Sequence, residues 1–184
     1  VQFDPFDVYF GYGRSASLYT ASEIVMTGTI ISLAYNAQTP EITVIPIKIY
    51  LKSITSATLT PDIWDNMTAG ATLVYSGNFI CNNTGWNTID IMDFPYCGDN
   101  LIIMVESDYG GLGINTLSEF YYSDVPSTHL FFTDYDPPSG ICSVDGERPN
   151  IQFVFAPSSI CSGIPVAGTP VAAPSSVCLG APTI

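Results

Sequence analysis

Hydrophobic residues along the chain fall in short runs that alternate with polar residues, and turn residues separate these runs roughly every 8–12 positions. The clearest run is Ile42–Leu51, where the side chains of Ile45, Ile47, Ile49 and Leu51 share one face. A period of two is typical of a β-strand with one buried side. The same pattern predicts strands at Thr27–Asn36, Ala71–Tyr75, Trp86–Ile91, Asn100–Glu106, Tyr121–Ser123, His129–Thr133 and Asn150–Phe155.

These strands predict an all-β fold in which two antiparallel sheets pack face to face as a β-sandwich. Pro46 has no N–H to donate, which predicts a sheet edge or a bulge at that position. Thr60–Asn66, with Pro61 at a first helical position, is expected to form one helical turn. The side chains expected inside are Ile45, Ile47, Ile49, Leu51, Leu101, Ile103 and Val105, with Thr29, Ile31, Leu33 and Tyr35 sharing a face and Trp64 and Trp86 in the core.

The chain has few charged residues, and most of them are acidic. There are 4 Lys and Arg against 17 Asp and Glu, giving a formal net charge of −13. This balance argues against nucleic acid and anionic membrane surfaces, which both attract basic proteins. Charged residues make up 11% of the chain, whereas the usual figure is about 25%. Such a low content of charged residues is common in extracellular β proteins. The longest apolar run, Leu101–Val105, is too short to cross a bilayer, so no membrane insertion is expected.

The five cysteines favour disulfide bonds in an oxidising compartment, because none of them forms a CxxC pair of the kind that binds zinc. Cys81 and Cys97 end consecutive strand-like runs and are expected to pair across them. Cys161 and Cys178 are expected to close a short loop, which leaves Cys142 without an internal partner. A bridge from Cys142 to Cys161 is the main alternative.

A change in composition near Ala156 divides the chain. Residues 1–156 are expected to form the sandwich, and residues 157–184, rich in Pro, Ala, Ser and Val, a linker or the start of a following module. The N-terminus has neither a Met nor the basic and apolar regions of a signal peptide, so Val1 is expected to follow a processing or trimming site.

Several strings of residues carry a family resemblance. Leu18–Ile24 and Gly28–Tyr35 resemble the opening of a β-sandwich module found in large exported proteins of Bacteroidetes-type bacteria. The resemblance continues through Lys48–Lys52, Thr72–Gly77, Gly85–Ile89, Asp99–Ile103 and Arg148–Gln152, and the tail from Cys161 resembles the start of an immunoglobulin-like repeat. It implies a jelly-roll-like sandwich, type IX secretion and a larger host protein. It implies no activity, since a fold does not fix a function.

Candidate site residues lie in predicted loops and at strand ends. Asp4, Asp7, Asp134 and Asp136 are the carboxylates proposed to hold calcium, a metal that prefers oxygen ligands; no other cofactor is expected. Tyr9, Tyr12, Tyr121 and Tyr122 are proposed as an aromatic platform for sugar rings. The single histidine, His129, is interpreted as structural, and Arg148 as the partner of a structural ion pair with an Asp.

The sequence therefore favours a non-catalytic, extracellular or cell-surface adhesive module that associates with other copies or with neighbouring modules into a filament or surface layer. Phe3–Tyr12 and Gly163–Ile184 are the segments expected at such contacts. The alternative is a carbohydrate-binding module of an exported glycan-degrading enzyme. A hydrolase is disfavoured because the sequence places no partners around the lone histidine.

Overall fold

The computed structural model describes residues 2–157. Strands account for 57% of the structure and helices for 6%, which confirms the predicted all-β class. In chain order the elements are β1 (Tyr12–Tyr19), α1 (Ala21–Ile24), β2 (Gly28–Thr39), β3 (Ile45–Ile54), α2 (Trp64–Thr68), β4 (Thr72–Phe79), β5 (Gly85–Tyr96), β6 (Asn100–Asp108), β7 (Glu119–Phe120), β8 (Tyr122–Asp134), β9 (Ser143–Pro149) and β10 (Ile151–Phe155).

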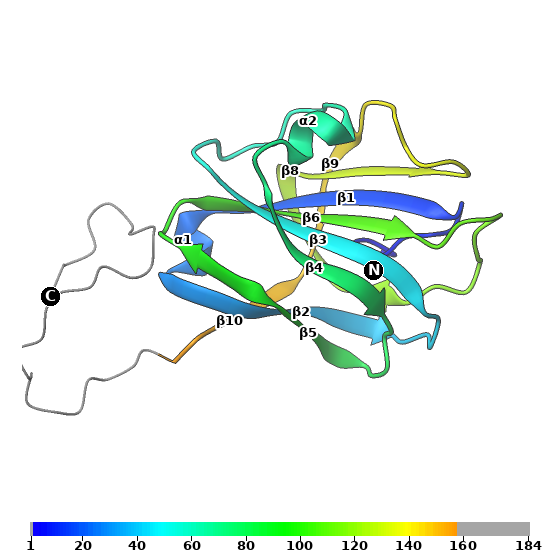
Figure 1. Cartoon of the computed structure of the whole chain (residues 1–184), viewed down its shortest axis with the longest axis horizontal. Helices are drawn as coiled ribbons and strands as arrows, with labels where there is room; N and C mark the ends of the chain where they lie inside the picture. Colours follow the sequence, from blue (N-terminus) through cyan, green and yellow to red (C-terminus); the bar gives the residue numbers. More distant parts are fainter. Residues whose placement is uncertain (1, 158–184) are drawn as a thin grey trace, which may run out of the picture.

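The strands form two antiparallel sheets that pack as a sandwich (Figure 1). The larger sheet has six strands in the order β4-β3-β6-β1-β8-β9. The smaller sheet has the order β10-β2-β5, with β7 paired to the end of β2. The chain repeatedly crosses between the layers, as from β1 to β2 and from β4 to β5.

The main core lies between the sheets and contains the predicted inward face of β3 and β6. The side chains of Ile45, Ile47, Ile49, Leu51, Leu101, Ile103 and Val105 all belong to it, and none is more than 5% exposed. Alternation of apolar and polar residues identified this face in β3. β6 instead carries an uninterrupted apolar run, Leu101–Val105, which is buried on both faces of the larger sheet.

The face predicted for β2 is wrong at one end because the strand contains a bulge. The pairing of β2 with β5 shifts between Ile30 and Ser32. An extra residue in one strand reverses which side chains point inward. Ile30 therefore enters the core together with Leu33 and Tyr35, whereas Ile31 remains partly exposed.

Pro46 lies on an internal strand rather than on an edge strand, and the bulge of β3 falls between Ile49 and Tyr50. Pairing of β3 with β6 begins only at Ile47, and Pro46 is paired with Asn78 of β4 alone. The missing N–H of proline is thus accommodated where one neighbouring strand is absent, not by the predicted bulge.

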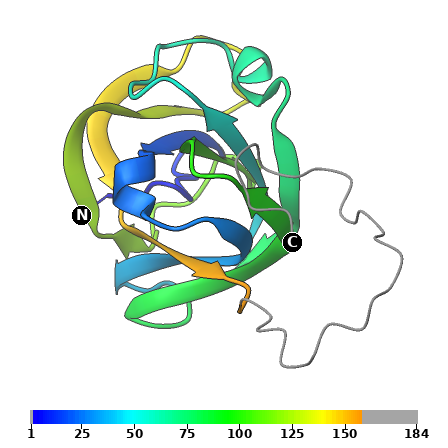
Figure 2. The same cartoon turned by 90° about the vertical axis from the view of Figure 1, so that its left-hand side faces the viewer.

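Segment Gln2–Gly11 fills the part of the inner face that the smaller sheet does not cover (Figure 2). It forms no regular strand, but Phe6 and Val8 are 2% and 0% exposed and belong to the main core. The Phe6 ring stacks on Phe79 with 4.0 Å between centroids. In the segment expected at intermolecular contacts, Phe6 and Val8 are therefore packed inside its own sandwich, whereas Phe3 and Tyr9 remain exposed.

A second, smaller core covers the outer face of the larger sheet. Trp64 of α2 packs there against Leu18, Met104 and Leu130, which confirms its predicted burial. The helix begins at Trp64, later than the turn predicted from Thr60. No helix among residues 2–157 is long and apolar enough to span a membrane.

Candidate functional site

Trp86 is the most prominent aromatic side chain on the outer face of the smaller sheet. It is 46% exposed, so its predicted place in the core is wrong. Ile89 points into the core from β5 and pairs with the core residue Leu33 of β2. Because successive side chains of a strand point to opposite sides, Trp86 must share the outward side with Thr88 and Asp90. The alternation of Trp86, Thr88 and Asp90 with Ile89 is visible in the sequence, and it could have predicted that Trp86 is exposed.

Two surface cavities share the Trp86 side chain. The larger has a volume of about 600 Å³ and lies where β4 and β5 meet. The smaller, of about 330 Å³, also contains Asn150 and Ser123. The exposed polar side chains around the larger cavity are Asn78, Asn82, Asn83, Thr88 and Asp90.

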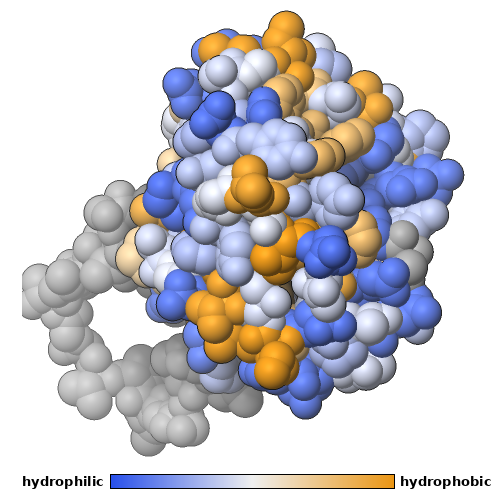
Figure 3. Space-filling view, turned by 90° about the vertical axis from the view of Figure 1, so that its right-hand side faces the viewer, coloured by the Kyte–Doolittle hydropathy of each residue, from blue (hydrophilic) through white to orange (hydrophobic). Residues whose placement is uncertain are grey.

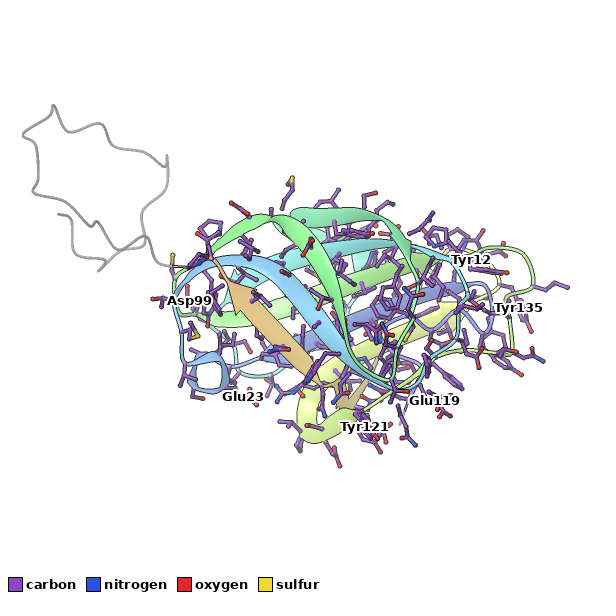
Figure 4. All side chains as sticks on the ribbon, turned by 90° about the horizontal axis from the view of Figure 1, so that it is seen from below. Tyr12, Glu23, Asp99, Glu119, Tyr121 and Tyr135 are labelled. Carbon is purple, nitrogen blue, oxygen red and sulfur yellow. The ribbon has the colours of Figure 1, made fainter. Side chains whose placement is uncertain are left out.

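Tyr121 lies on the same face as Trp86, on the other side of β2. Asn36 of β2 is paired with Trp86 of β5, and the Asn36 carbonyl accepts the N–H of Tyr121 at 2.9 Å. Phe120 is fully buried, so the next side chain along the extended backbone, Tyr121, points outward and is 43% exposed. Figure 4 looks onto this face, with Tyr121 near the start of β10. Two strand spacings separate the aromatic residues by about 10 Å.

The four tyrosines proposed from the sequence as a platform do not lie together. Tyr12 begins β1 opposite Asp134, and Figure 4 places it beside Tyr135 at one end of the sandwich, away from Tyr121. Tyr9 packs against Phe10 at this end, with 4.9 Å between ring centroids. Of the proposed set, Tyr121 and the adjacent Tyr122 lie next to the Trp86 face.

Buried polar side chains form a hydrogen-bonded chain beneath the N-terminal segment. The Ser15 hydroxyl lies 2.9 Å from Nε2 of His129, and Nδ1 of His129 lies 2.8 Å from a carboxylate oxygen of Asp145. His129 is fully buried and hydrogen-bonded, in keeping with its structural interpretation. Strands β1, β8 and β9 bring these residues together from distant parts of the sequence, which is why sequence patterns did not reveal the arrangement.

The carboxylates proposed for calcium are divided between two places. Asp4 and Asp7 line a cavity of about 240 Å³ together with Asp145 and Glu147. Asp134 ends β8, and Asp136 lies in the loop beyond it. Within residues 2–157, no group of three or more His, Cys, Asp or Glu side chains is arranged to hold a metal ion.

All four basic side chains of the protein are engaged within the fold. Arg14 and Lys48 both pair with Glu106, and the Lys52 ammonium donates to backbone carbonyl oxygens. Arg148 pairs with Glu23, a glutamate rather than the predicted aspartate, and its guanidinium stacks on Tyr19. Hydrogen bonds from Arg148 lower the pKa of Glu23 to about 2. Three of these cations are therefore paired with carboxylates, and the fourth, Lys52, is hydrogen-bonded to carbonyl oxygens.

Two of the disulfide bonds considered from the sequence are not formed. Cys81 and Cys142 are free, buried thiols, so the Cys81–Cys97 bridge and the alternative Cys142–Cys161 bridge are both wrong. Cys81 belongs to the main core between the two sheets, and Cys142 belongs to the outer core around Trp64. The predicted Cys161–Cys178 bridge lies outside the described residues.

Alkylation of the cysteine thiols tests whether Cys81 and Cys142 are free and buried. Burial raises the pKa of the Cys142 thiol to about 11 and also raises that of Cys81, so both should react slowly with iodoacetamide in the folded protein. Unfolding without reductant should make both fully reactive, as read by peptide mass spectrometry. Recovery of a disulfide-linked peptide containing Cys81 and Cys97 would contradict the structure.

No protein-family model, curated protein or solved structure matches the chain. The resemblance to modules of exported bacterial proteins therefore stays a prediction, and the function rests on the geometry of the site.

Proposed function

We propose that this chain is a non-catalytic, extracellular adhesive module of a larger secreted or cell-surface protein, and that it binds neutral glycan chains on the outer face of its smaller sheet. The observation that carries the proposal is the half-exposed indole of Trp86 within a ring of amide, hydroxyl and carboxylate groups.

The chemistry of this face suits a sugar ring. The apolar C–H face of a pyranose stacks on an aromatic ring, while its hydroxyl groups need both donors and acceptors around the edge. Asn82 and Asn83 offer amides that can do both, and Asp90 offers acceptors. Tyr121 provides a second aromatic surface about 10 Å away, which suits a chain of sugars better than a single terminal residue.

The charge of the protein supports a neutral ligand. Uronic acids and sulfated sugars need a free cation, and each Lys and Arg of the chain already has partners within the fold. The net charge of −13 would repel a polyanion further.

The buried Ser15–His129–Asp145 chain supports a structural role rather than hydrolysis. It has the connectivity of a serine-hydrolase triad, but Ser15 is 1% exposed and His129 is 0% exposed. Ser15 also lies within a strand paired on both sides, whereas acyl transfer needs free N–H donors beside the nucleophile.

Self-association is a second proposal, favoured by exposed apolar side chains. Val25, Ile42 and Leu112 are 81%, 80% and 85% exposed and lie in three different connections. Figure 3 shows hydrophobic patches among hydrophilic surface on one end of the sandwich. Such patches on an extracellular module suit contacts with other copies or neighbouring modules.

A glycan array tests the main proposal. The full chain should bind neutral polysaccharides, and Trp86→Ala should strongly weaken that binding. Tyr9→Ala is the matched control because Tyr9 is equally exposed, at 46%, but lies elsewhere. Loss of binding in Tyr9→Ala with retention in Trp86→Ala would move the site to the tyrosine group predicted from the sequence. Binding to acidic glycans alone would contradict the charge argument.

A further inference from the structure

We propose that the smaller of the two cavities at Trp86 holds an N-acetylated sugar residue, so that the preferred ligand is a neutral glycan chain that contains N-acetylhexosamine. The inference rests on the proposed function and specifies its substrate. The indole of Trp86 stacks on one sugar ring, and the smaller cavity recognises the acetamido group of the neighbouring sugar.

The smaller cavity lies at the free edge of the smaller sheet. β10 is the outer strand of this sheet and, within residues 2–157, pairs with β2 alone. The helix α1 lies beside the corner between β9 and β10 (Figure 2), where Arg148 of β9 pairs with Glu23 of α1. The Trp86 side chain reaches the cavity from β5. A volume of about 330 Å³ is at the lower end of the range for small-molecule sites, roughly 300–1,000 Å³, and suits a single sugar residue.

Apolar side chains form one part of the cavity wall. They are Ile24 from α1 and Ile151 and Phe153 from β10. Ile24 is buried, and the two β10 side chains pack against the main core while remaining partly exposed. A sugar hydroxyl placed here would lose its water without gaining a partner, whereas the methyl group of an acetamido substituent would bury apolar surface. This part of the wall therefore favours the acetylated sugar.

The polar part of the wall offers hydrogen-bond donors. The Ser123 hydroxyl donates to Oδ1 of Asn150 at 2.7 Å, which leaves the –NH₂ of that amide for a ligand. Within residues 2–157 no group accepts a hydrogen bond from this nitrogen. The Nε–H of Arg148, whose side chain also lines the cavity, is buried and has no acceptor in the same range. Buried donors are rarely left unpaired, so the cavity favours a ligand that brings a carbonyl oxygen, as an acetamido group does.

The ion pair in the wall disfavours charged sugars. Both terminal nitrogens of Arg148 donate to Glu23, and one of them also donates to the carbonyl oxygen of Leu18. One carboxylate oxygen of Glu23 accepts in addition from the backbone N–H and the hydroxyl of Thr20. Since each charge already has its partners, neither a sugar carboxylate nor a sugar ammonium group finds a free counter-charge. A neutral acetamido group needs none.

Calorimetric titration of the full chain with two tetrasaccharides tests the inference. β-1,4-linked tetramers of N-acetylglucosamine and of glucose share one backbone and differ in an acetamido or a hydroxyl group on each ring. The acetylated tetramer should bind about 10-fold more tightly or better, the combined effect of one net hydrogen bond and a buried methyl group. The deacetylated glucosamine tetramer should bind no more tightly than the glucose tetramer. If it binds as tightly as the acetylated form, the preference comes from its positive charge, and the inference fails.

Two matched variants locate the preference. Asn150→Asp keeps the shape of the side chain and the acceptor for Ser123 but removes both N–H donors, so the preference should fall below about threefold. Asn82→Asp makes the same change at an exposed residue of the larger cavity and should leave the preference intact. The ratio of two affinities measured on one sample does not depend on the fraction of folded protein. An unchanged ratio in Asn150→Asp, or an equal fall in Asn82→Asp, would overturn the inference.

The same titrations distinguish this inference from the proposed function. Trp86→Ala should weaken both tetramers by a similar factor, because the indole stacks on the ring and not on its substituent. Equal affinities of the wild-type chain for the acetylated and glucose tetramers would overturn the acetamido preference and leave the glycan-binding proposal standing. Absence of binding to every neutral glycan on the array would overturn both.

Discussion

Replacement of Phe6 by alanine is expected to lower the free energy of unfolding by about 3–5 kcal/mol, the usual range for removing a buried phenylalanine ring. The Phe6 side chain is 2% exposed and contacts the rings of Tyr35, Phe79 and Phe120. Its removal would leave a cavity in the core between the sheets. Urea unfolding followed by circular dichroism measures the loss.

Phe3 provides the control for this experiment. It belongs to the same N-terminal segment but is 37% exposed, so Phe3→Ala should change the unfolding free energy by less than about 1 kcal/mol. Equal effects of the two substitutions would mean that the segment does not insert Phe6 into the core. A loss confined to Phe6→Ala would establish that this irregular segment is part of the sandwich.

Trp86→Ala is expected to weaken glycan binding by about 30-fold or more, since truncating a central aromatic contact typically removes 2 kcal/mol or more of binding free energy. The fold should be nearly unaffected, because the removed side chain is half exposed and lies on an outer face. Isothermal titration calorimetry with a glycan identified on the array gives the affinity, and thermal unfolding gives the stability.

Tyr121→Ala should reduce the affinity less, because Tyr121 lies at the margin of the face beside Asn36. Tyr9→Ala should leave it unchanged. Equal losses in all three variants would point to a general effect of removing exposed aromatic rings rather than to a platform centred on Trp86.

Strands marked by regular or continuous apolar residues were the part of the fold that could be predicted from the sequence. In β3 the apolar positions repeat every second residue, and burial follows that repeat. In β6 the signal was an uninterrupted apolar run, Leu101–Val105, and all of its side chains are buried. β1 was missed because its sequence, rich in Ser, Gly and Ala, lacks this signal. It is nevertheless internal in the larger sheet, where neighbouring strands bury it regardless of its own propensity.

The site was less predictable because it depends on pairing between distant strands. Ser15 and His129 are 114 residues apart in the sequence, and the pairing of β1 with β8 brings them together. The aromatic platform for sugar rings was assigned to the wrong residues for another reason. Tyrosines near predicted loops were preferred over Trp86, although the parity of Trp86 with Thr88 and Asp90, opposite to that of Ile89, already favoured an exposed side chain.

The indole N–H signals of the two tryptophans provide the most direct test of the proposed function. Trp64 is buried in the outer core, and Trp86 lies half exposed on the opposite layer. In a ¹⁵N-resolved NMR titration with a neutral oligosaccharide, the Trp86 indole signal should shift with a saturable dependence on concentration, while that of Trp64 stays in place. A Trp86 signal that remains unmoved at saturating binding, measured on the same sample by calorimetry, would contradict the account.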